Sequence, residues 1–264
     1  MKKLISLYAL LCILVSCSQQ EFTFVQLTDP QIGFMDETPG YQATSDSFDR
    51  CMEMVNGIHP DLVIITGDLI HQPTDSLQCS IYKDIVAKAD NGIEVLAVPG
   101  NHDMLKYSEE SRARYMEFMG YDRFSIIHKG CAFIGIDSNC IKENDTQRAQ
   151  EQWDWLESEL GKAAKCRHRF IFLHCPVIRE TMDEKEDYFN FPMDERQRYC
   201  ELFKKYDVDA VFSGHTHIGY ETNVDGVQFI NAGPVGPSFI DKPGFNVISV
   251  GKDGWNCEYQ LLKK

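Results

Sequence analysis

Short apolar runs alternate with helical stretches along most of the chain. The runs at residues 22–28, 62–66 and 95–98 each end at a polar or glycine-rich loop, which leads into a segment with helical spacing. This alternation is typical of an α/β fold. The run at 62–66 (LVIIT) and the later run at 170–173 (FIFL) are apolar throughout, as expected of strands buried on both faces. The pattern therefore predicts helices on the outside of the sheet or sheets.

The same criteria place the other elements. Helices are expected at residues 44–58, 76–90, 108–119, 146–160 and 194–206. Further strands are expected at residues 132–137, 170–173, 210–212, 228–230, 245–250 and 255–261. Trp153 shares helical spacing with Leu156 and Leu160, which favours a place in the core. Since no repeat or Pro/Gly/Ser-rich linker divides residues 22–264, we expect one domain there.

The first residues have a different pattern. Two lysines precede an apolar run at residues 4–15, which is too short to span a bilayer as a helix and is typical of an export signal. The run ends in Leu-Val-Ser-Cys at residues 14–17, which resembles the lipobox of bacterial lipoproteins. We therefore expect a signal peptide at 1–16, a lipidated Cys17 and a short tether at 17–21 before the domain at 22–264. The resemblance implies a Gram-negative lipoprotein anchored to the outer membrane and facing the periplasm or the cell surface. A plain signal peptide with an incidental cysteine is the alternative.

Charge and cysteine content narrow the classes of function. The 264 residues contain 26 Lys and Arg against 40 Asp and Glu, a net charge of −14 that repels polyphosphate backbones, so we expect no nucleic-acid partner. A chain of this length buries enough surface to fold without a structural metal, so a metal site would serve chemistry. Eight cysteines follow residue 21 without a CxxC pair. Their places in apolar runs and helices favour free core thiols over disulfides, whose pairing the sequence leaves open.

Polar side chains with metal-binding chemistry follow the predicted strands. They lie in five segments: Thr28-Asp29-Pro30-Gln31, Thr66-Gly67-Asp68, Pro99-Gly100-Asn101-His102-Asp103, Leu173-His174-Cys175-Pro176 and Ser213-Gly214-His215-Thr216-His217. Open α/β sheets place their sites at such strand ends. Carboxylates, amides and imidazoles suit Mn, Fe, Zn or Mg.

These segments resemble the signature of the calcineurin-like metallophosphoesterases, which reads D-x-H, GD, GNH[DE], a lone His and GHxH. All five blocks occur in this order over residues 29–217. The sequences at 29–33 (DPQIG), 188–192 (YFNFP) and 210–215 (AVFSGH) are similar to the branch of calcineurin-like phosphoesterase domain-containing protein 1, which contains Ser/Thr phosphatases. The resemblance implies a four-layer α/β/β/α sandwich with a dinuclear metal site at the strand ends.

The resemblance also implies a role for each motif residue. Two divalent metal ions would share Asp68 as a bridging ligand. The first ion would be held by Asp29, Gln31 and His217, and the second by Asn101, His174 and His215. A metal-bridging hydroxide would attack phosphorus in line with the leaving oxygen. His102 would protonate that oxygen as general acid, and Asp103 would orient the His102 imidazole.

Two positions depart from patterns in related enzymes. Gln31 stands where most of the superfamily has His, and its amide oxygen is a harder and weaker ligand. His71 stands where purple acid phosphatases have a metal-ligating Tyr, which argues against a tyrosinate-bound ferric site. Four histidines lie outside the motifs and are expected to be surface or hydrogen-bonded residues: His59, His71, His128 and His168. Tyr188 and Asn190 are candidate substrate contacts by the branch resemblance, with a structural role in their loop equally open.

The predicted function is the hydrolysis of phosphate esters outside the cytoplasm, with phosphomonoesters on a small molecule or a phosphoprotein as the preferred substrates. Three alternatives remain. The first is a phosphodiesterase acting on cyclic nucleotides or phospholipid headgroups. The second is a non-catalytic phospho-ligand-binding lipoprotein, suggested by Gln31 alone. The third is an interaction lipoprotein in a surface complex, which predicts no metal and a large exposed apolar patch.

Overall fold

The structure is a computed structural model that describes residues 20–238 and 240–263. The predicted signal peptide and Cys17 lie outside the described residues. Within the described ranges, no helix is both long enough and apolar enough to cross a membrane. The fold is built from layers that bury their apolar faces against one another.

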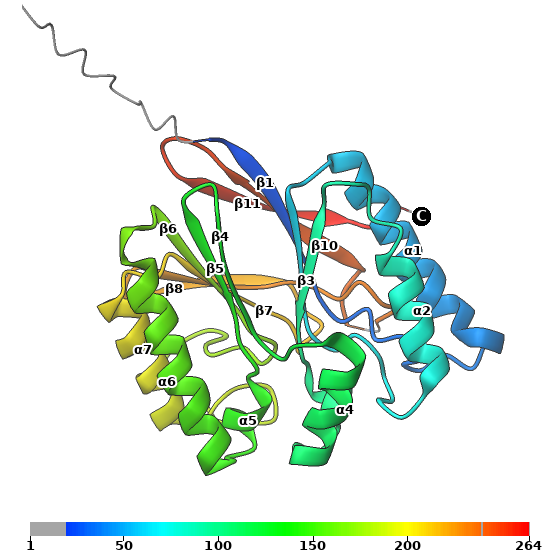
Figure 1. The fold of residues 1–264 in the computed structure, drawn as a ribbon, viewed down its shortest axis with the longest axis horizontal. Coiled ribbons are helices and arrows are strands. Elements are labelled where there is room, and N and C mark those ends of the chain that lie inside the picture. The colour runs from blue at the N-terminus through cyan, green and yellow to red at the C-terminus, as the bar shows by residue number, and fades with distance from the viewer. Residues whose placement is uncertain (1–19, 239, 264) are drawn as a thin grey trace, which may run out of the picture.

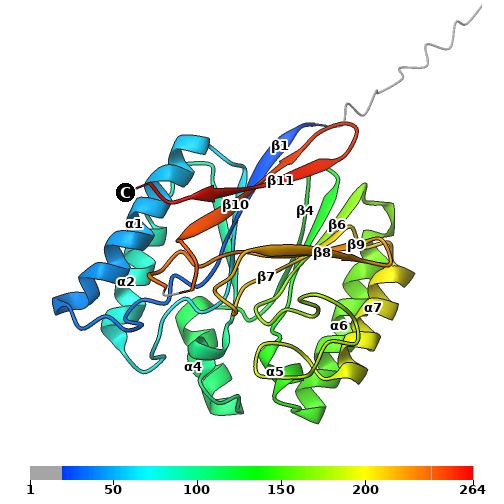
Figure 2. The same ribbon diagram turned by 180° about the vertical axis from the view of Figure 1, so that it is seen from behind.

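Two mixed sheets form the centre of the molecule (Figures 1 and 2). The first has the order β11-β10-β1-β2-β3, in which β1, β2 and β3 run parallel and β10 and β11 are antiparallel additions. Its strands are β1 (Phe22–Leu27), β2 (Leu62–Thr66), β3 (Glu94–Val98), β10 (Gly244–Val250) and β11 (Trp255–Leu261). The parallel strands of this sheet all end at the same edge.

The second sheet has the order β4-β5-β6-β7-β9-β8. Neighbouring strands from β5 to β9 in this order are parallel, and the two edge strands are antiparallel. Its strands are β4 (Phe124–His128), β5 (Cys131–Gly135), β6 (His168–Phe172), β7 (Ala210–Ser213), β8 (Tyr220–Val224) and β9 (Val227–Asn231).

Helices cover the outer face of each sheet, which confirms the predicted four-layer sandwich (Figure 1). The helices that pack on the first sheet are α1 (Gln42–Ile58), α2 (Ser76–Val86) and α4 (Glu109–Met119). Those that pack on the second are α5 (Asn139–Lys142), α6 (Thr146–Lys162) and α7 (Met193–Lys205). Three shorter elements complete the described part: α3 (Asn101–Met104), η1 (Pro39–Tyr41) and η2 (Ala163–Lys165).

Alternation along each central strand divides the core into three layers. On β1, Phe24 faces the second sheet, whereas Val25 and Leu27 face the helices. The layer between the sheets is rich in phenylalanine, with Phe24 and Phe133 edge to face at 5.0 Å and Phe172 stacked on Phe212 at 5.1 Å between ring centroids. Burial of rings on this scale dominates the stability of such a core. Trp153 is buried against α7, as its spacing predicted.

The structure contains each predicted helix and strand, with small shifts at the ends. Helix α2 starts where the Asp75 carboxylate accepts the N–H groups of Leu77 and Gln78, and it ends at Val86 rather than at residue 90. Strands β4 and β8 were not predicted. Both are edge strands whose residues alternate between exposed and more buried positions, so neither forms a continuous apolar run.

The cysteines in the described part of the chain are free thiols. They are Cys51, Cys79, Cys131, Cys140, Cys166, Cys175, Cys200 and Cys257. Cys51 and Cys131 are fully buried among apolar side chains, where a thiol packs as a small apolar group. This agrees with the preferred prediction of core cysteines.

Candidate metal centre

The predicted ligands meet at one edge of the sandwich, where parallel strands of both sheets end. Asp29 and Asp68 follow β1 and β2, and Asn101 begins α3 after β3. His174 follows β6, and His215 follows β7. The first sheet therefore contributes oxygen ligands and the second contributes imidazoles, as expected for a site at the carboxyl ends of strands.

Most of these ligands have a backbone conformation that side chains rarely adopt. The predicted ligands with positive φ are Asp29 (51°), Gln31 (42°), Asp68 (51°), His215 (72°) and His217 (57°). Each such residue costs about 1–3 kcal/mol and persists only where its surroundings hold it. Here Gln31 N–H donates to Asp68 O at 2.8 Å and Asp29 N–H donates to Gly67 O at 3.1 Å. The two loops thus hold each other in the conformation that brings their carboxylates together.

Two glycines allow the loops after β2 and β3 to touch. Gly67 has a φ of 87°, and a Cβ built there would lie 2.6 Å from the backbone nitrogen of Gly100. A Cβ on Gly100 would collide in turn with the backbone nitrogen of Asp68. Only glycine fits at both positions, which explains the glycines of the GD and GNH motifs.

Three buried side chains form a group able to hold a cation. One ligand atom each from Asp68, His174 and His215 lies within 4.8 Å of the others. His174 Nδ1 is 2.8 Å from Thr66 O, and because a carbonyl only accepts, the ring carries its proton on Nδ1. The lone pair of Nε2 then faces Asn101 Oδ1 at 3.0 Å and Asp68 Oδ1 at 3.4 Å. Three electron-rich atoms converge, an arrangement that a positive ion stabilises.

A second group of possible metal ligands lies around Asp29. Its Oδ2 accepts hydrogen bonds from Thr28 Oγ1 at 2.7 Å and from His215 N–H at 3.1 Å, and its Oδ1 lies 3.4 Å from His217 Nε2. Asp29 Oδ1 and Gln31 Oε1 are buried and accept no hydrogen bond from the residues the structure describes. A buried oxygen that accepts no hydrogen bond destabilises the folded state. Because oxygen ligands are what hard divalent cations prefer, this donor set fits a metal ion as well.

The carboxylates are close enough to affect one another. Burial, followed by the charge of Asp29, raises the pKa of Asp68 well above its usual range. Burial would also raise the pKa of Asp29, but the charge of His217 outweighs it and holds that pKa below the usual range. Asp68 is therefore the member of this pair that keeps a proton when no cation is present. A divalent cation between the two would replace that proton.

His102 lies beside this group rather than within it. Its Nδ1 is buried and has no hydrogen-bond partner among the described residues. Burial, with a contribution from His71, lowers the pKa of His102 to about 4. The His71 ring lies 4.8 Å from the His102 ring, and Phe34 packs edge to face on both. Phe34 also contacts the His217 ring, so it borders the site although no motif contains it.

Of the four histidines outside the motifs, three behave as predicted. His59 is largely exposed, and His128 and His168 contact Asp61 and Asp209. The prediction for His71 is wrong, because its Nδ1 is buried without a partner in the described part of the chain and its ring borders the site. Its position three residues after Asp68 on the same loop was the available signal.

Asp103 does not contact the His102 imidazole in the predicted manner. Its Oδ1 accepts the N–H groups of Leu69 (2.9 Å) and Ile70 (3.2 Å), and its Oδ2 accepts that of Gly100 (2.7 Å). The carboxylate thus ties the loop after Asp68 to the loop before Asn101. Burial, followed by the charge of Asp68, raises the pKa of Asp103 well above its usual range.

The two candidate substrate contacts have different surroundings. Tyr188 is 59% exposed, its hydroxyl accepts a hydrogen bond from Asn101 Nδ2 at 3.0 Å, and its ring lies 4.9 Å from that of His215. Asn190 is fully buried and bonds to Glu184, Lys185 and Asp187 within its own loop. Tyr188 is thus available to a substrate, whereas the substrate contact expected of Asn190 is wrong because its amide is committed to the loop.

Two supporting residues carry no motif signal. Gln26 Nε2 donates to Thr66 Oγ1 at 3.1 Å in the first sheet and to Ser213 O at 2.8 Å in the second, so it joins the sheets beneath the site. Asn139 Nδ2 donates to the carbonyls of Pro99 and Gly100 and supports the loop that carries Asn101. A glutamine between the apolar residues Val25 and Leu27 of β1 was the sequence signal for the first.

Comparison with known proteins gives consistent matches. Residues 22–219 match the family model described as calcineurin-like phosphoesterase. The chain is 28% identical over 264 residues to the serine/threonine-protein phosphatase CPPED1 of Danio rerio, covering 91% of this chain and 85% of that protein. It is 28% identical over 173 residues to a probable glycerophosphodiester phosphodiesterase, GpdQ, of Arcobacter nitrofigilis, covering 64% of this chain and 61% of that one. A dimetal phosphatase from Danio rerio has the same fold, with a TM-score of 0.68, 14% identity, and coverage of 92% of this chain and 99% of that chain.

Proposed function

The chain belongs to the calcineurin-like phosphoesterase family, and from this premise we propose that it is a phosphomonoesterase that uses two divalent metal ions. The observation that carries the proposal is the convergence of buried, electron-rich atoms from both sheets at one edge of the sandwich. The family uses divalent metals, and the donor set of this chain suits Mn, Fe, Zn or Mg. The similarity to CPPED1 phosphatases supports a monoester substrate, on a small molecule or a phosphoprotein.

The proposed ligand sets follow the two groups of donors. Asp68 lies between them as the shared ligand. We assign Asp29, Gln31 and His217 to one ion, and Asn101, His174 and His215 to the other. When bound, the two ions polarise the phosphoryl oxygens and lower the pKa of coordinated water. The unpartnered Gln31 Oε1 supports its place as a ligand, since a buried amide oxygen without a donor is otherwise destabilising.

We propose that His102 supplies the proton that the leaving oxygen requires. Its backbone N–H donates to Asp68 Oδ1 at 2.8 Å, which fixes the residue next to the ligands. Phe34 and His71 pack against the ring and restrict its rotation. The negative charge of a bound phosphate ester favours the protonated imidazole and so opposes the effect of burial.

Metal analysis combined with activity measurements tests this function. Wild-type full chain should bind two ions and hydrolyse p-nitrophenyl phosphate faster than bis(p-nitrophenyl) phosphate. Asp68→Asn should lose activity and at least one ion, because a shared carboxylate neutralises both. Asp225→Asn is the matched control, since Asp225 is an exposed carboxylate paired with Lys204. Metal binding without turnover of either ester would instead favour the phospho-ligand-binding alternative.

A phosphodiesterase is the second candidate. The similarity to the Arcobacter nitrofigilis protein named as a probable glycerophosphodiester phosphodiesterase supports it. The two p-nitrophenyl substrates distinguish a diesterase from a monoesterase, because a diesterase should hydrolyse bis(p-nitrophenyl) phosphate faster than p-nitrophenyl phosphate. That result would leave the metal ligands in place and change only the substrate class.

We also propose that the protein is exported and held at the outer membrane by lipid on Cys17. The support is the sequence at residues 14–17 after a short apolar run. Stable anchoring requires at least two acyl chains, because one chain binds a membrane only marginally. Wild type should incorporate labelled palmitate and enter the detergent phase, and Cys17→Ser should do neither. Labelling that persists in Cys17→Ser would contradict the proposal.

A further inference from the structure

Several exposed apolar side chains lie in the loops at the metal-centre edge of the sandwich. The described residues include nine large apolar side chains with high exposure. Five of them lie in loops at the metal-centre edge: Met35, Leu105, Tyr188, Ile218 and Ile240. Two of these side chains, Ile218 and Ile240, line the same cavity.

This cavity of about 630 Å³ is lined by side chains from residues 179–189 and 216–220 and by Ile240. Its lining includes Phe189, whose ring lies 5.6 Å from the ring of His215, and Thr216, the residue between His215 and His217. Ile218 and Ile240, which are 42% and 62% exposed, also line it. The cavity therefore adjoins the metal centre, and its volume lies in the range of small-molecule sites.

The charges around this cavity cancel. Arg179 and Lys185 line it together with Glu180 and Glu184, which gives two positive and two negative groups. Arg179 is further committed to Asp187, to which it donates a hydrogen bond of 2.8 Å. The Glu184 carboxylate accepts three backbone N–H groups of its own loop, from residues 179, 180 and 181. A charged organic group would gain little net attraction from this balanced set, whereas an uncharged apolar group gains contact with Phe189, Ile218 and Ile240.

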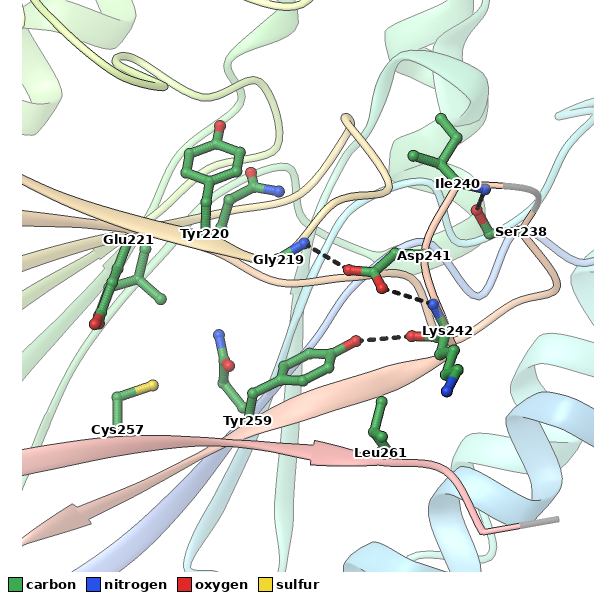
Figure 3. Close-up of a pocket in the computed structure, with 13 residues that line it drawn as sticks. Gly219, Tyr220, Glu221, Ser238, Ile240, Asp241, Lys242, Cys257, Tyr259 and Leu261 are labelled. Carbon is green, nitrogen blue, oxygen red and sulfur yellow. Dashed lines mark hydrogen bonds between the residues drawn. The ribbon is translucent and has the colours of Figure 1, made fainter.

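Hydrogen bonds within the protein hold in place the two loops that carry Phe189 and Ile240. The buried Arg196 donates to the carbonyls of Met182 and Glu184, which fixes the loop that carries Phe189. The loop that carries Ile240 is tied down by Asp241, which accepts Gly219 N–H at 3.2 Å, and by Tyr259, whose hydroxyl donates to Lys242 O at 3.1 Å (Figure 3). A site that is already formed loses little entropy when a ligand binds.

We propose that this cavity holds the organic group of the phosphate ester and that the group is an uncharged apolar chain or ring. The inference rests on the proposed phosphomonoesterase function and adds the class of its substrate. With the phosphoryl group at the metal centre, the group on its ester oxygen reaches Phe189, Ile218 and Ile240 on the side of His215. The preferred substrate is thus a small amphiphilic phosphomonoester.

A larger cavity of about 900 Å³ shares Tyr220 and Ile240 with this one. It lies between β8 and β11, and its lining includes neither Phe189 nor Thr216, the residues that bring the smaller cavity next to His215 (Figure 3). We therefore assign the apolar group to the smaller cavity, which adjoins His215.

A series of n-alkyl phosphates tests the inference without changing the chemistry. Ethyl, butyl and hexyl phosphate release alcohols of nearly equal acidity, so differences in kcat/KM report burial of the chain. Each buried methylene should raise kcat/KM about three- to fourfold. We expect hexyl phosphate to exceed ethyl phosphate on the order of 50-fold, which allows for incomplete burial. Hexylphosphonate, which resists hydrolysis, should bind more tightly than ethylphosphonate by a similar factor in calorimetric titrations.

Variants of the residues that line the cavity test whether the dependence of kcat/KM on chain length arises there. Ile218→Ser and Ile240→Ser should each lower the ratio of kcat/KM for hexyl over ethyl phosphate by roughly three- to tenfold. Ile127→Ser is the matched control, because Ile127 is 66% exposed on the edge strand β4 and lies outside the cavity. That variant should keep the wild-type ratio. All three positions are exposed, so the proteins should fold normally.

The outcomes separate the two proposals. If the enzyme hydrolyses ethyl phosphate but shows no gain with chain length, the apolar subsite is wrong and the proposed function stands. Faster hydrolysis of a phosphoserine peptide than of hexyl phosphate would also overturn the subsite. If metal binds and no monoester reacts, the proposed function fails. Tighter phosphonate binding with chain length would then still support the cavity as an apolar binding site.

Discussion

Replacing Asp103 should weaken the fold rather than remove proton transfer selectively. The carboxylate accepts hydrogen bonds from the N–H groups of Leu69, Ile70 and Gly100, and so connects the loops that carry Asp68 and Asn101. Asp103→Ala leaves these three donors without an acceptor. Because they are buried next to the metal centre, water replaces the carboxylate poorly, and we expect loss of stability together with weaker metal binding.

The size of the effect follows from the number of bonds. An unpaired buried N–H group costs about 1–3 kcal/mol, so three cost roughly 3–9 kcal/mol before compensation. Part of this is offset, because the substitution removes a buried carboxyl group that lies near Asp68. We therefore expect the lower limit, about 3 kcal/mol. For a chain of this size each kcal/mol shifts Tm by roughly 2–4 °C, which predicts a fall of about 6–12 °C.

Thermal unfolding of Asp103→Ala and Asp103→Asn, each with chelator and with Mn²⁺, provides the assay. Asp103→Asn keeps one carbonyl oxygen for two of the N–H groups and should lose about half as much stability. Hydrolysis of ethyl and p-nitrophenyl phosphate should fall by the same factor in each variant. If Asp103→Ala unfolds like wild type and loses mainly ethyl phosphate hydrolysis, then Asp103 acts through His102, as the sequence suggested.

Three further predictions concern the metal centre. His102→Ala should retain metal and lose about 10²- to 10⁴-fold on ethyl phosphate but less on p-nitrophenyl phosphate, whose leaving group needs little protonation; equal losses would exclude the general-acid role. Mn²⁺ at about 100 times its Kd should stabilise the protein by about 2.7 kcal/mol and raise Tm by roughly 5–11 °C. Because the raised pKa of Asp68 makes the metal-free fold bind an extra proton, its stability falls as pH rises above the usual carboxyl range, and at a fixed Mn²⁺ concentration the gain in Tm should increase with pH in thermal scans. Gln31→His should raise the affinity for Zn²⁺ relative to Mn²⁺ and Gln31→Ala should weaken both, whereas identical titrations of all three proteins would show that Gln31 is no ligand.

The sequence predicts best those strands whose burial on both faces determines their composition. Strands β2 and β6 are buried on both faces, so their apolar runs allow few other structures. The edge strands β4 and β8 were missed because one side of each remains exposed and their patterns resemble loops. An edge strand forms because it pairs with a neighbouring strand, as Phe124 pairs with Gly135. The residues of one segment alone do not show which strand it will pair with.

For the candidate site, the sequence predicted where the residues lie but not the direction of their side chains. Strand ends fix where a loop starts, so the motifs place Asp68, Asn101 and His174 at one edge before any coordinates are known. The direction of each side chain depends on loop backbone angles, such as the positive φ of Asp68 and His215, which the sequence shows only through adjacent glycines. The side chain of Asn190 is held by hydrogen bonds within its own loop, and the His71 ring borders the site because it packs against His102 and Phe34, contacts that no single motif shows.

The misplaced role of Asp103 has a cause in helix geometry. His102 and Asp103 are consecutive residues of α3, and consecutive helical side chains point about 100° apart rather than along a common face. A direct bond between their side chains is therefore disfavoured as soon as the segment is known to be helical. The N–H groups that Asp103 binds, in contrast, lie at the start of its own helix and on the neighbouring loop, where an acidic residue at the third helical position normally caps the first turn. The three successive side chains of the GNHD motif thus lie differently: Asn101 Oδ1 faces His174 Nε2, the His102 ring packs against His71, and Asp103 turns back to hold both loops in place.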